Sequence, residues 1–400
     1  YIFLFLLFGA FLVQTGVGNY FNDLAIAIAG KRTGGPAKVA VFSSALQGTI
    51  SGSSVANVVT TGSYTIPMMK RLGYHKNFAG AVEAASSTGG QIMPPIMGAA
   101  AFLMIEFAGV PYWEIAKAAL VPALLYFAGI WIMTHLEAKR TGLHGLPAEQ
   151  IPKMAVVLKR FHLLAPIVII VYLLFDGFSI ERTALYGILS AIIVSLFLKD
   201  TRMTPAKFLE ALVTGARTAL GVAAACACAG IIVGVVTKTG LGLKMGNGLL
   251  DMAGVLAKGN LNIQIFLTLV FTMITSLIIG MGSPTTANYI ITSTIALPAV
   301  VALNHILPAG EAIPILAGHM FVFYFGIVAD ITPPVALAAF AATGISGGDP
   351  IKTGINASKL AIAAFIIPYM FVLQPQLLMI DTSFIEVTFI FATAIAGMIA

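Results

Sequence analysis

Long apolar stretches make up most of the chain, and short polar or glycine-rich segments separate them. Residues 119–134, 163–175 and 183–198 are almost wholly apolar, and each approaches the roughly 20 residues that a helix needs to cross the core of a bilayer. A chain in lipid must pair its backbone polar groups internally, which these stretches can do as helices. The pattern therefore predicts an all-α polytopic membrane protein.

The pattern of apolar and polar segments occurs twice. GTISGSSVANVVTTGSYTIP (48–67) corresponds to IGMGSPTTANYIITSTIALP (279–298), and GGQIMPPIM (89–97) corresponds to VADITPPVA (328–336). Two related halves, each with a hydroxyl-rich segment and a proline-broken segment, are typical of secondary transporters that bind solute between the repeats. We expect one repeat over 1–134, a connector with scaffold helices over 135–220, and a second repeat over 221–400.

Each hydroxyl-rich segment predicts a re-entrant helical hairpin, over 37–68 and 263–299. Glycine and serine release the helix at SGS and at GMGSP, and each arm is too short to span the membrane alone. The segments that follow, 77–108 and 312–345, predict helices interrupted by a double proline. Pro94 and Pro333 each remove a backbone donor, so carbonyls near them lose their helical partners. Such carbonyls at membrane depth face protein, water or an ion.

Composition and charge indicate how the halves are oriented. The chain is 58% hydrophobic and only 10% charged, whereas soluble domains carry roughly 25% charged residues. Only Lys258 and Glu311 flank the second hairpin, whereas the first is flanked by bases alone, namely Lys31, Arg32, Lys38, Lys70, Arg71 and Lys76. By the positive-inside rule, the first hairpin opens from the cytoplasm and the second from outside, which predicts inverted repeats. The net charge of +6 is thus a matter of orientation and not of nucleic-acid binding.

The two hairpin tips gather neutral oxygen donors. They are Ser51, Ser53, Ser54 and Asn57 in the first tip, and Ser283, Thr285, Thr286 and Asn288 in the second. Hydroxyl and carbonyl oxygens at helix ends suit Na⁺. The second arms begin near Ser54 and Thr285, where free N–H groups suit a carboxylate. A single Ser or Thr more often bonds its own helix carbonyl, so the prediction depends on the clustering.

Asp330 is the outstanding ionisable group, because it lies in the second broken segment where the first repeat has Gln91. A carboxylate at membrane depth indicates a functional site by default. Two interpretations stay open. Asp330 contacts a second cation, or it braces the broken segment by accepting hydrogen bonds from N–H groups near the prolines.

Three segments carry a family resemblance: ISGSSVANVVTTGSYTIPMMKRLGYHKNFAGAVEAASSTGGQIMPP, GMGSPTTANYI and ADITPPVALAAFAATGISGGDP. They closely resemble the large membrane subunit (M subunit, DctM-like) of tripartite ATP-independent periplasmic (TRAP) transporters. The forms VVTTGS and ASSTGGQIMPPIMGAAAFLM are most similar to the fused permeases of the TAXI branch. On that resemblance the chain is a fragment of a longer protein, whose missing N-terminus would carry the small four-helix Q-type subunit.

The resemblance implies an elevator-type, sodium-coupled importer in the bacterial inner membrane that receives a small organic acid from a periplasmic binding protein. The acid would be a dicarboxylate, a keto acid or an acidic amino acid, and Na⁺ the coupling ion. By this analogy the substrate residues are Ser53, Ser54, Asn57, Thr285, Thr286 and Asn288. The cation residues are Ser51, Gly52, Gly89, Gly90, Gln91 and Met93 in the first half, and Gly282, Ser283, Ala329, Asp330 and Thr332 in the second. Gly142 and Gly145 in the connector are expected to act as flexible joints.

Other classes fit the sequence less well. The nearest alternative is a stand-alone sodium-coupled dicarboxylate symporter, or an ion antiporter, of related architecture. An intramembrane enzyme is disfavoured, because the sequence lacks a His/Glu metal spacing and Asp330 and His319 lie eleven residues apart. Cys226 and Cys228 point away from each other on a predicted helix, so we expect two buried apolar side chains and no metal site.

Overall fold

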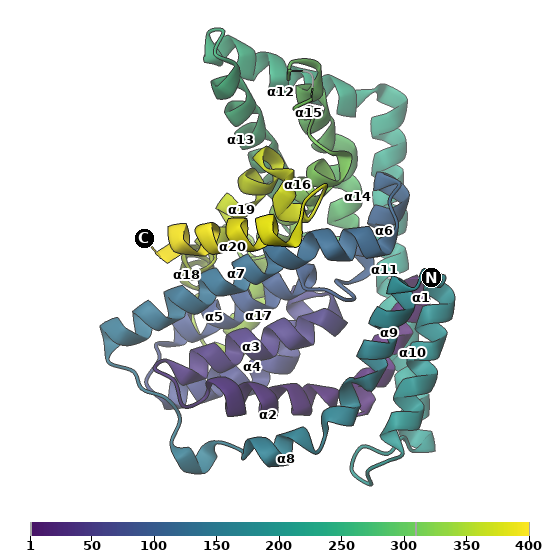
Figure 1. Cartoon of the computed structure of the whole chain (residues 1–400), viewed down its shortest axis with the longest axis vertical. Helices are drawn as coiled ribbons and strands as arrows, with labels where there is room; N and C mark the ends of the chain where they lie inside the picture. The colour runs from purple at the N-terminus through teal and green to yellow at the C-terminus, as the bar shows by residue number, and fades with distance from the viewer. Residues whose placement is uncertain (1, 309, 400) are drawn as a thin grey trace.

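The structure, a computed structural model, describes residues 2–308 and 310–399, and the regular elements in these residues are all helical (Figure 1). Residues 1, 309 and 400, which the predicted repeats include, lie outside the described part. Four helices are long and apolar enough to cross a membrane, or up to seven if each bent pair counts as one span. The four are Tyr112–Thr141, Pro205–Thr239, Leu261–Gly280 and Thr285–His305. The last two contain the arms of the second predicted hairpin, so the expectation that each arm is too short to span the membrane is wrong for that hairpin. The predicted all-α polytopic class is confirmed.

The chain begins with two helices joined at a sharp bend. α1 (Ile2–Gln14) and α2 (Val17–Ala29) meet at an angle of 65°, although the apolar pattern predicts one helix to about residue 18. The bend falls at Gly16, whose φ of 81° is left-handed, a conformation that glycine adopts readily. The bend lets α1 pack against α10 and α11 while α2 packs against α3.

The first hydroxyl-rich segment forms two packed helices, α3 (Gly35–Ser51) and α4 (Ser54–Arg71). Gly52 ends α3 with a left-handed φ of 58°, and Ser53 caps α4 by accepting a hydrogen bond from the N–H of Ala56 at 3.4 Å. The double-proline segment that follows separates α5 (Lys76–Gly89) and the short η1 (Gly90–Ile92) from α6 (Ala99–Ala108).

The middle of the chain comprises one long helix, a surface connector and two shorter apolar helices. The helices are α7 (Tyr112–Thr141), η2 (Ala148–Gln150), α8 (Met154–Leu158), η3 (Phe161–Leu164), α9 (Ala165–Phe175) and α10 (Ile180–Ser195). Gly142 ends α7 in an open position, but Gly145 packs against the backbone of the turn at Lys31, where a Cβ would lie 2.5 Å from the carbonyl oxygen. The expectation of a flexible joint at Gly145 is wrong, because Leu146 also donates to the Gly30 carbonyl at 2.8 Å.

The second half begins with the long helix α11, and a pair of helices around the second tip and an interrupted helix follow. Its helices are α11 (Pro205–Thr239), α12 (Leu241–Ala257), α13 (Leu261–Gly280), α14 (Thr285–Ile295), α15 (Leu297–Ala302), η4 (Leu303–His305), α16 (Ile315–Val328), α17 (Leu337–Ser346), α18 (Pro350–Leu360), α19 (Ile362–Leu373), η5 (Pro375–Leu378) and α20 (Phe384–Ile399). Most of α11 is exposed. Cys226 on this helix is therefore only half-buried and Cys228 is exposed, so the prediction of two buried thiols is wrong.

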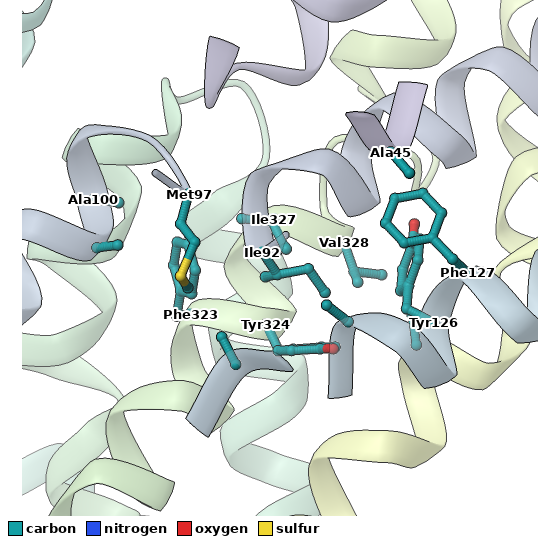
Figure 2. Packing of buried hydrophobic residues seen from close by; sticks show 14 of the residues in the cluster. Ala45, Ile92, Met97, Ala100, Tyr126, Phe127, Phe323, Tyr324, Ile327 and Val328 are labelled. Atoms are coloured by element: carbon teal, nitrogen blue, oxygen red, sulfur yellow. The ribbon is translucent and has the colours of Figure 1, made fainter. Parts of the chain in front are cut away.

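The two interrupted helices tie the halves together, because the second part of each packs against the other half. α17 packs against α4 and α5, and α6 packs against α14 and α16. Figure 2 shows the apolar core at this junction: Ile92 and Met97 of the first interruption lie beside Phe323, Tyr324 and Ile327 of α16. Both interruptions are thereby held in the centre of the molecule.

Candidate functional site

Two buried amides occupy equivalent places behind the two tips. The Nδ2 group of Asn57 donates to the carbonyl of Ser44 at 2.9 Å, and that of Asn288 donates to the carbonyl of Gly326 at 2.6 Å. Asn57 is 0% exposed and Asn288 2%. Each amide oxygen is buried and has no hydrogen-bond partner among the described residues. A buried acceptor without a donor is costly, and a cation would satisfy both.

Glycines bring the first tip onto the first interruption. A Cβ on Gly48 would lie 2.2 Å from the Cα of Gly90, and a Cβ on Gly52 would lie 2.1 Å from the Cα of Gly98. The hydroxyl of Ser51 beside them is buried and has no partner among the described residues. The structure thus brings Ser51, Gly52 and Asn57 to the same interruption that holds Gly90.

Replacing Gly48 by Ala is expected to lower the free energy of unfolding by about 1–3 kcal/mol or more, because overpacking against backbone cannot be relieved by a side-chain rotation. Thermal unfolding of the purified protein in detergent measures the effect. Gly344→Ala is the matched control, since Gly344 lies in α17 with nothing within 4 Å of a Cβ. Equal melting temperatures for the two variants would contradict the close packing of α3 on the interruption.

A hydrogen-bonded network of four side chains links the two halves at the centre. The hydroxyl of Ser54 donates to Oδ2 of Asp330 at 2.6 Å, and Nε2 of Gln91 donates to the same oxygen at 3.1 Å. The hydroxyl of Thr285 donates to Oε1 of Gln91. Ser54 and Thr285 are equivalent positions of the repeats, as are Gln91 and Asp330, so each second arm bonds the interruption of the opposite half.

This hydrogen-bonded network of side chains bears on the two interpretations of Asp330. The side chain is 6% exposed. In the described part of the chain, its carboxylate accepts hydrogen bonds from the side chains of Ser54 and Gln91, and not from the backbone N–H groups that the bracing interpretation requires. The carboxylate lies where the N-termini of α4 and α14 are joined through one hydrogen-bonded network. Charge, hydroxyl groups and two helix N-termini are therefore concentrated at one place.

Other predicted residues have local roles. The hydroxyl of Thr332 donates to the carbonyl of Val328 at 2.8 Å, and that of Ser283 lies 3.4 Å from the carbonyls of Ile279 and Gly280 at the end of α13. Such bonds to nearby backbone are the ordinary structural role of these groups. Gly282 has a φ of 79°. Gly89 faces Tyr126 of α7 and not the tip. Thr286 is buried, Met93 is half-buried, and Ala329 lies beside Gly280 at the end of α13.

Sequence reasoning missed the most deeply buried acid near the first tip, Glu83 of α5. Its side chain is 0% exposed. Oε1 contacts the hydroxyls of Ser44 at 2.7 Å, Ser87 at 3.0 Å and Thr61, and Oε2 contacts the hydroxyl of Thr65. A single acid within the run GAVEAASSTGG (80–90), which is otherwise small or hydroxylic, is the signal that could have identified it.

Comparison with known proteins extends across nearly the whole chain. A family model described as "Tripartite ATP-independent periplasmic transporter, DctM component" matches residues 1–385. The chain is 29% identical over 206 residues to the C4-dicarboxylate TRAP transporter large permease protein DctM of Pseudomonas aeruginosa. The matched segment covers 50% of this chain and 47% of that protein.

Two further relatives carry other substrate names. The sialic acid TRAP transporter large permease protein SiaM of Vibrio cholerae is 26% identical over 210 residues, 52% of this chain and 48% of its own length. The isethionate TRAP transporter permease protein DctMQ of Oleidesulfovibrio alaskensis is 24% identical over 345 residues, 86% of this chain and 51% of its own length. The chain thus matches about half the length of each of these relatives.

Proposed function

The chain belongs to the DctM component family of tripartite ATP-independent periplasmic transporters, a family of transporter permeases, and from this premise we propose that it forms the path of a sodium-coupled importer of small organic acids. Its family and apolar helices make it a multi-pass protein of the inner membrane. Energy would come from the sodium gradient, since the sequence holds no GxxxxGK[ST] phosphate-binding motif.

The paired amides carry this proposal. The amide oxygens of Asn57 and Asn288, which have no partner in the described part of the chain, occupy equivalent positions at the two tips. The side chain of Asn57 lies beside Gly90 of the first interruption, and that of Asn288 lies beside Gly326 of α16. Neutral oxygens fixed by helix ends are ligands for Na⁺ and not for transition metals. We therefore expect two cation sites, one in each half. Asn57, Ser51 and the segment 89–93 would form the first, and Asn288 and the segment 329–332 would form the second.

The substrate would lie between these cation sites, at the hydrogen-bonded network that joins Ser54 to Thr285. The first turns of α4 and α14 contribute N–H groups and positive helix-dipole ends, which favour a carboxylate. Bound cations would offset the negative charge of Asp330 and draw the acid to the same place. Substrate and sodium would thereby bind together, as coupling requires.

The repeats would be inverted, with the first hairpin opening from the cytoplasm and the second from the periplasm, as the distribution of Lys and Arg indicates. The substrate would arrive on a periplasmic binding protein, and a small Q-type subunit would complete the permease. Fusion of that subunit to this chain, and a place in the TAXI branch, stay predictions.

Uptake is expected to require Na⁺. The permease that carries this chain, with its binding protein, is reconstituted in liposomes and offered labelled succinate, sialic acid or isethionate in turn. One of these acids should accumulate with an inward sodium gradient and remain near background when choline replaces sodium, because choline is too large for a site of amide and hydroxyl oxygens. Uptake of the accepted acid at the same rate in choline would contradict sodium coupling.

The same assay separates the proposal from a stand-alone symporter. Omitting the binding protein should abolish uptake by a TRAP permease, whereas a stand-alone dicarboxylate symporter would transport succinate equally well without it. The three labelled acids also discriminate among the substrate classes that the relatives' names suggest.

A further inference from the structure

We infer that Glu83 of α5 is a proton-binding site where α5 packs against the first hairpin (α3 and α4), and that its proton controls the sodium affinity of the cation site at Asn57. Glu83 contacts α3 through Ser44, α4 through Thr61 and Thr65, and its own helix through Ser87. The proton site concerns Glu83 alone, whereas the control of the cation site rests on the sodium site proposed above.

The four hydroxyl groups around Glu83 can accompany either protonation state of its carboxyl group, and its isolation from cations in the described part of the chain favours the neutral acid. A hydroxyl group has one proton to donate. The hydroxyl of Thr65 contacts both Oε2 of Glu83 and the carbonyl of Thr61, the latter at 3.0 Å. If Thr65 donates to that carbonyl, its contact with Oε2 needs a proton on the carboxyl group. A proton on Oε2 then donates to Thr65, and Oε1 still accepts from the hydroxyls of Ser44, Ser87 and Thr61. If Thr65 instead donates to Oε2, each of the four hydroxyls supplies one proton to a carboxylate.

The surrounding charges do not provide an alternative to the proton. Among the described residues, no Lys or Arg forms an ion pair with Glu83. η1 and α17 have no titratable side chain. The titratable side chains on the other elements packed against α5, and on α5 itself, are Lys38 of α3, Tyr64, Lys70 and Arg71 of α4, Lys76 of α5, Tyr112, Glu114, Lys117, Tyr126, His135, Glu137, Lys139 and Arg140 of α7, and Lys352 and Lys359 of α18.

Three of these groups have other partners or lie at a helix end. Lys76 is seven residues from Glu83, about 10 Å along the helix. Lys70 donates to the carbonyl of Ser346 at 2.7 Å, and the hydroxyl of Tyr126 donates to the carbonyl of Ala85 at 2.8 Å. A carboxylate that is fully buried and not paired with a cation is very costly, whereas the protonated acid is not.

A polar cavity gives the proton a route to Glu83. About 170 Å³ of space lies between the bend of α1 and α2 and the first hairpin, and its polar lining is Asn19, Asn22, Gln47, Thr60 and Thr61. It has room for several water molecules. Thr61 both lines this cavity and contacts Oε1 of Glu83, so one hydroxyl separates the carboxyl group from the cavity.

The proton is coupled to the tip through two shared residues. Ser44 donates its hydroxyl to Glu83 and accepts from the amide of Asn57 with its carbonyl, and the hydroxyl of Thr61 lies 2.8 Å from the carbonyl of Asn57. Loss of the proton would place a negative charge within about two helical turns of a cation at Asn57. That charge would raise sodium affinity on the order of tenfold.

Infrared spectroscopy of the purified permease tests whether Glu83 carries a proton. The measurement uses an Asp330→Asn background, which removes the other buried carboxyl group of the site. We expect a protonated-carboxyl C=O band at neutral pH that disappears in Glu83→Gln and remains in the matched control Glu114→Gln, whose carboxylate is exposed beside Lys117. If Glu83→Gln does not fold, Thr65→Val should shift the frequency of the band, because it removes the hydroxyl that contacts Oε2.

Sodium titration, with Asp330 intact, tests whether the proton on Glu83 controls sodium binding. The sodium affinity of the wild type and of Glu114→Gln should rise with pH, and that of Glu83→Gln should not. A spectrum in which neither Glu83→Gln nor Thr65→Val alters the band would overturn the proton site. A loss of one bound sodium in Glu83→Gln without a change in the band would make Glu83 a sodium ligand instead. Sodium-independent uptake, the failure of the proposed function, would leave the infrared result unaffected.

Discussion

Asn57→Ala and Asn288→Ala are each expected to raise the sodium concentration for half-maximal uptake about 30-fold. Each variant removes a buried amide oxygen that has no partner among the described residues and that we propose binds the cation. Loss of one polar contact to a charged group costs on the order of 2 kcal/mol, which corresponds to that factor. The double variant should lose sodium-driven uptake, because both halves would then lack a ligand.

The experiment must separate a lost ligand from a damaged fold, because each amide also holds a carbonyl, of Ser44 or of Gly326. Sodium that binds only the folded protein raises the melting temperature. The wild type and Asn247→Ala, a change at an exposed position of α12, should show this rise, and the two site variants should show a smaller one. Unchanged sodium stabilisation in both would refute the role of the amides.

Much of the fold can be predicted from the sequence, because the strongest signals are local. Apolar length predicts helices, glycine and serine release them near Gly52 and Gly282, and the double prolines interrupt them before residues 94 and 333. The structure has helix ends at each of these places. The bend at Gly16 was missed because apolar residues continue on both sides of it, and nothing in the periodicity marks the change of direction.

The contacts between the halves could not be predicted from local signals. Gln91 and Asp330 were identified as equivalent, but only tertiary packing shows that they bond each other and that Ser54 and Thr285 cross to the opposite half. Gly145 was misjudged for the same reason, since its conformational freedom is removed by a turn more than a hundred residues earlier. The partners of Glu83 could not be predicted either, because the hydroxyls of Ser44, Thr61 and Thr65 lie on other helices and only tertiary packing brings them to its carboxyl group.

The remaining proposal is that the two hairpins (α3–α4 and α13–α14) and the two interrupted helices (α5–α6 and α16–α17) form one moving unit that slides against a frame. A disulfide between this unit and the frame should stop transport. The frame is α9 and α10 with α1, which packs against α10. A Cβ on Gly9 of α1 would lie 3.8 Å from Cγ2 of Ile50, near the end of α3, so cysteines at these two positions are within reach of a disulfide. Gly9 is chosen because α1 contacts α3 beside the first tip.

In an elevator the contact between Gly9 and Ile50 exists in only one orientation of the transporter, so Gly9→Cys/Ile50→Cys should crosslink in a sodium- and substrate-dependent way and lose uptake until reduced. The background lacks Cys226 and Cys228. Gly80→Cys/Ser346→Cys is the matched control, because a Cβ on Gly80 of α5 would lie 3.5 Å from that of Ser346 of α17 and both helices belong to the moving unit. Its disulfide should leave uptake intact. If the first pair crosslinks equally in every condition and uptake continues, the modules do not move past α1, and local opening of the two tips must alternate access to the site.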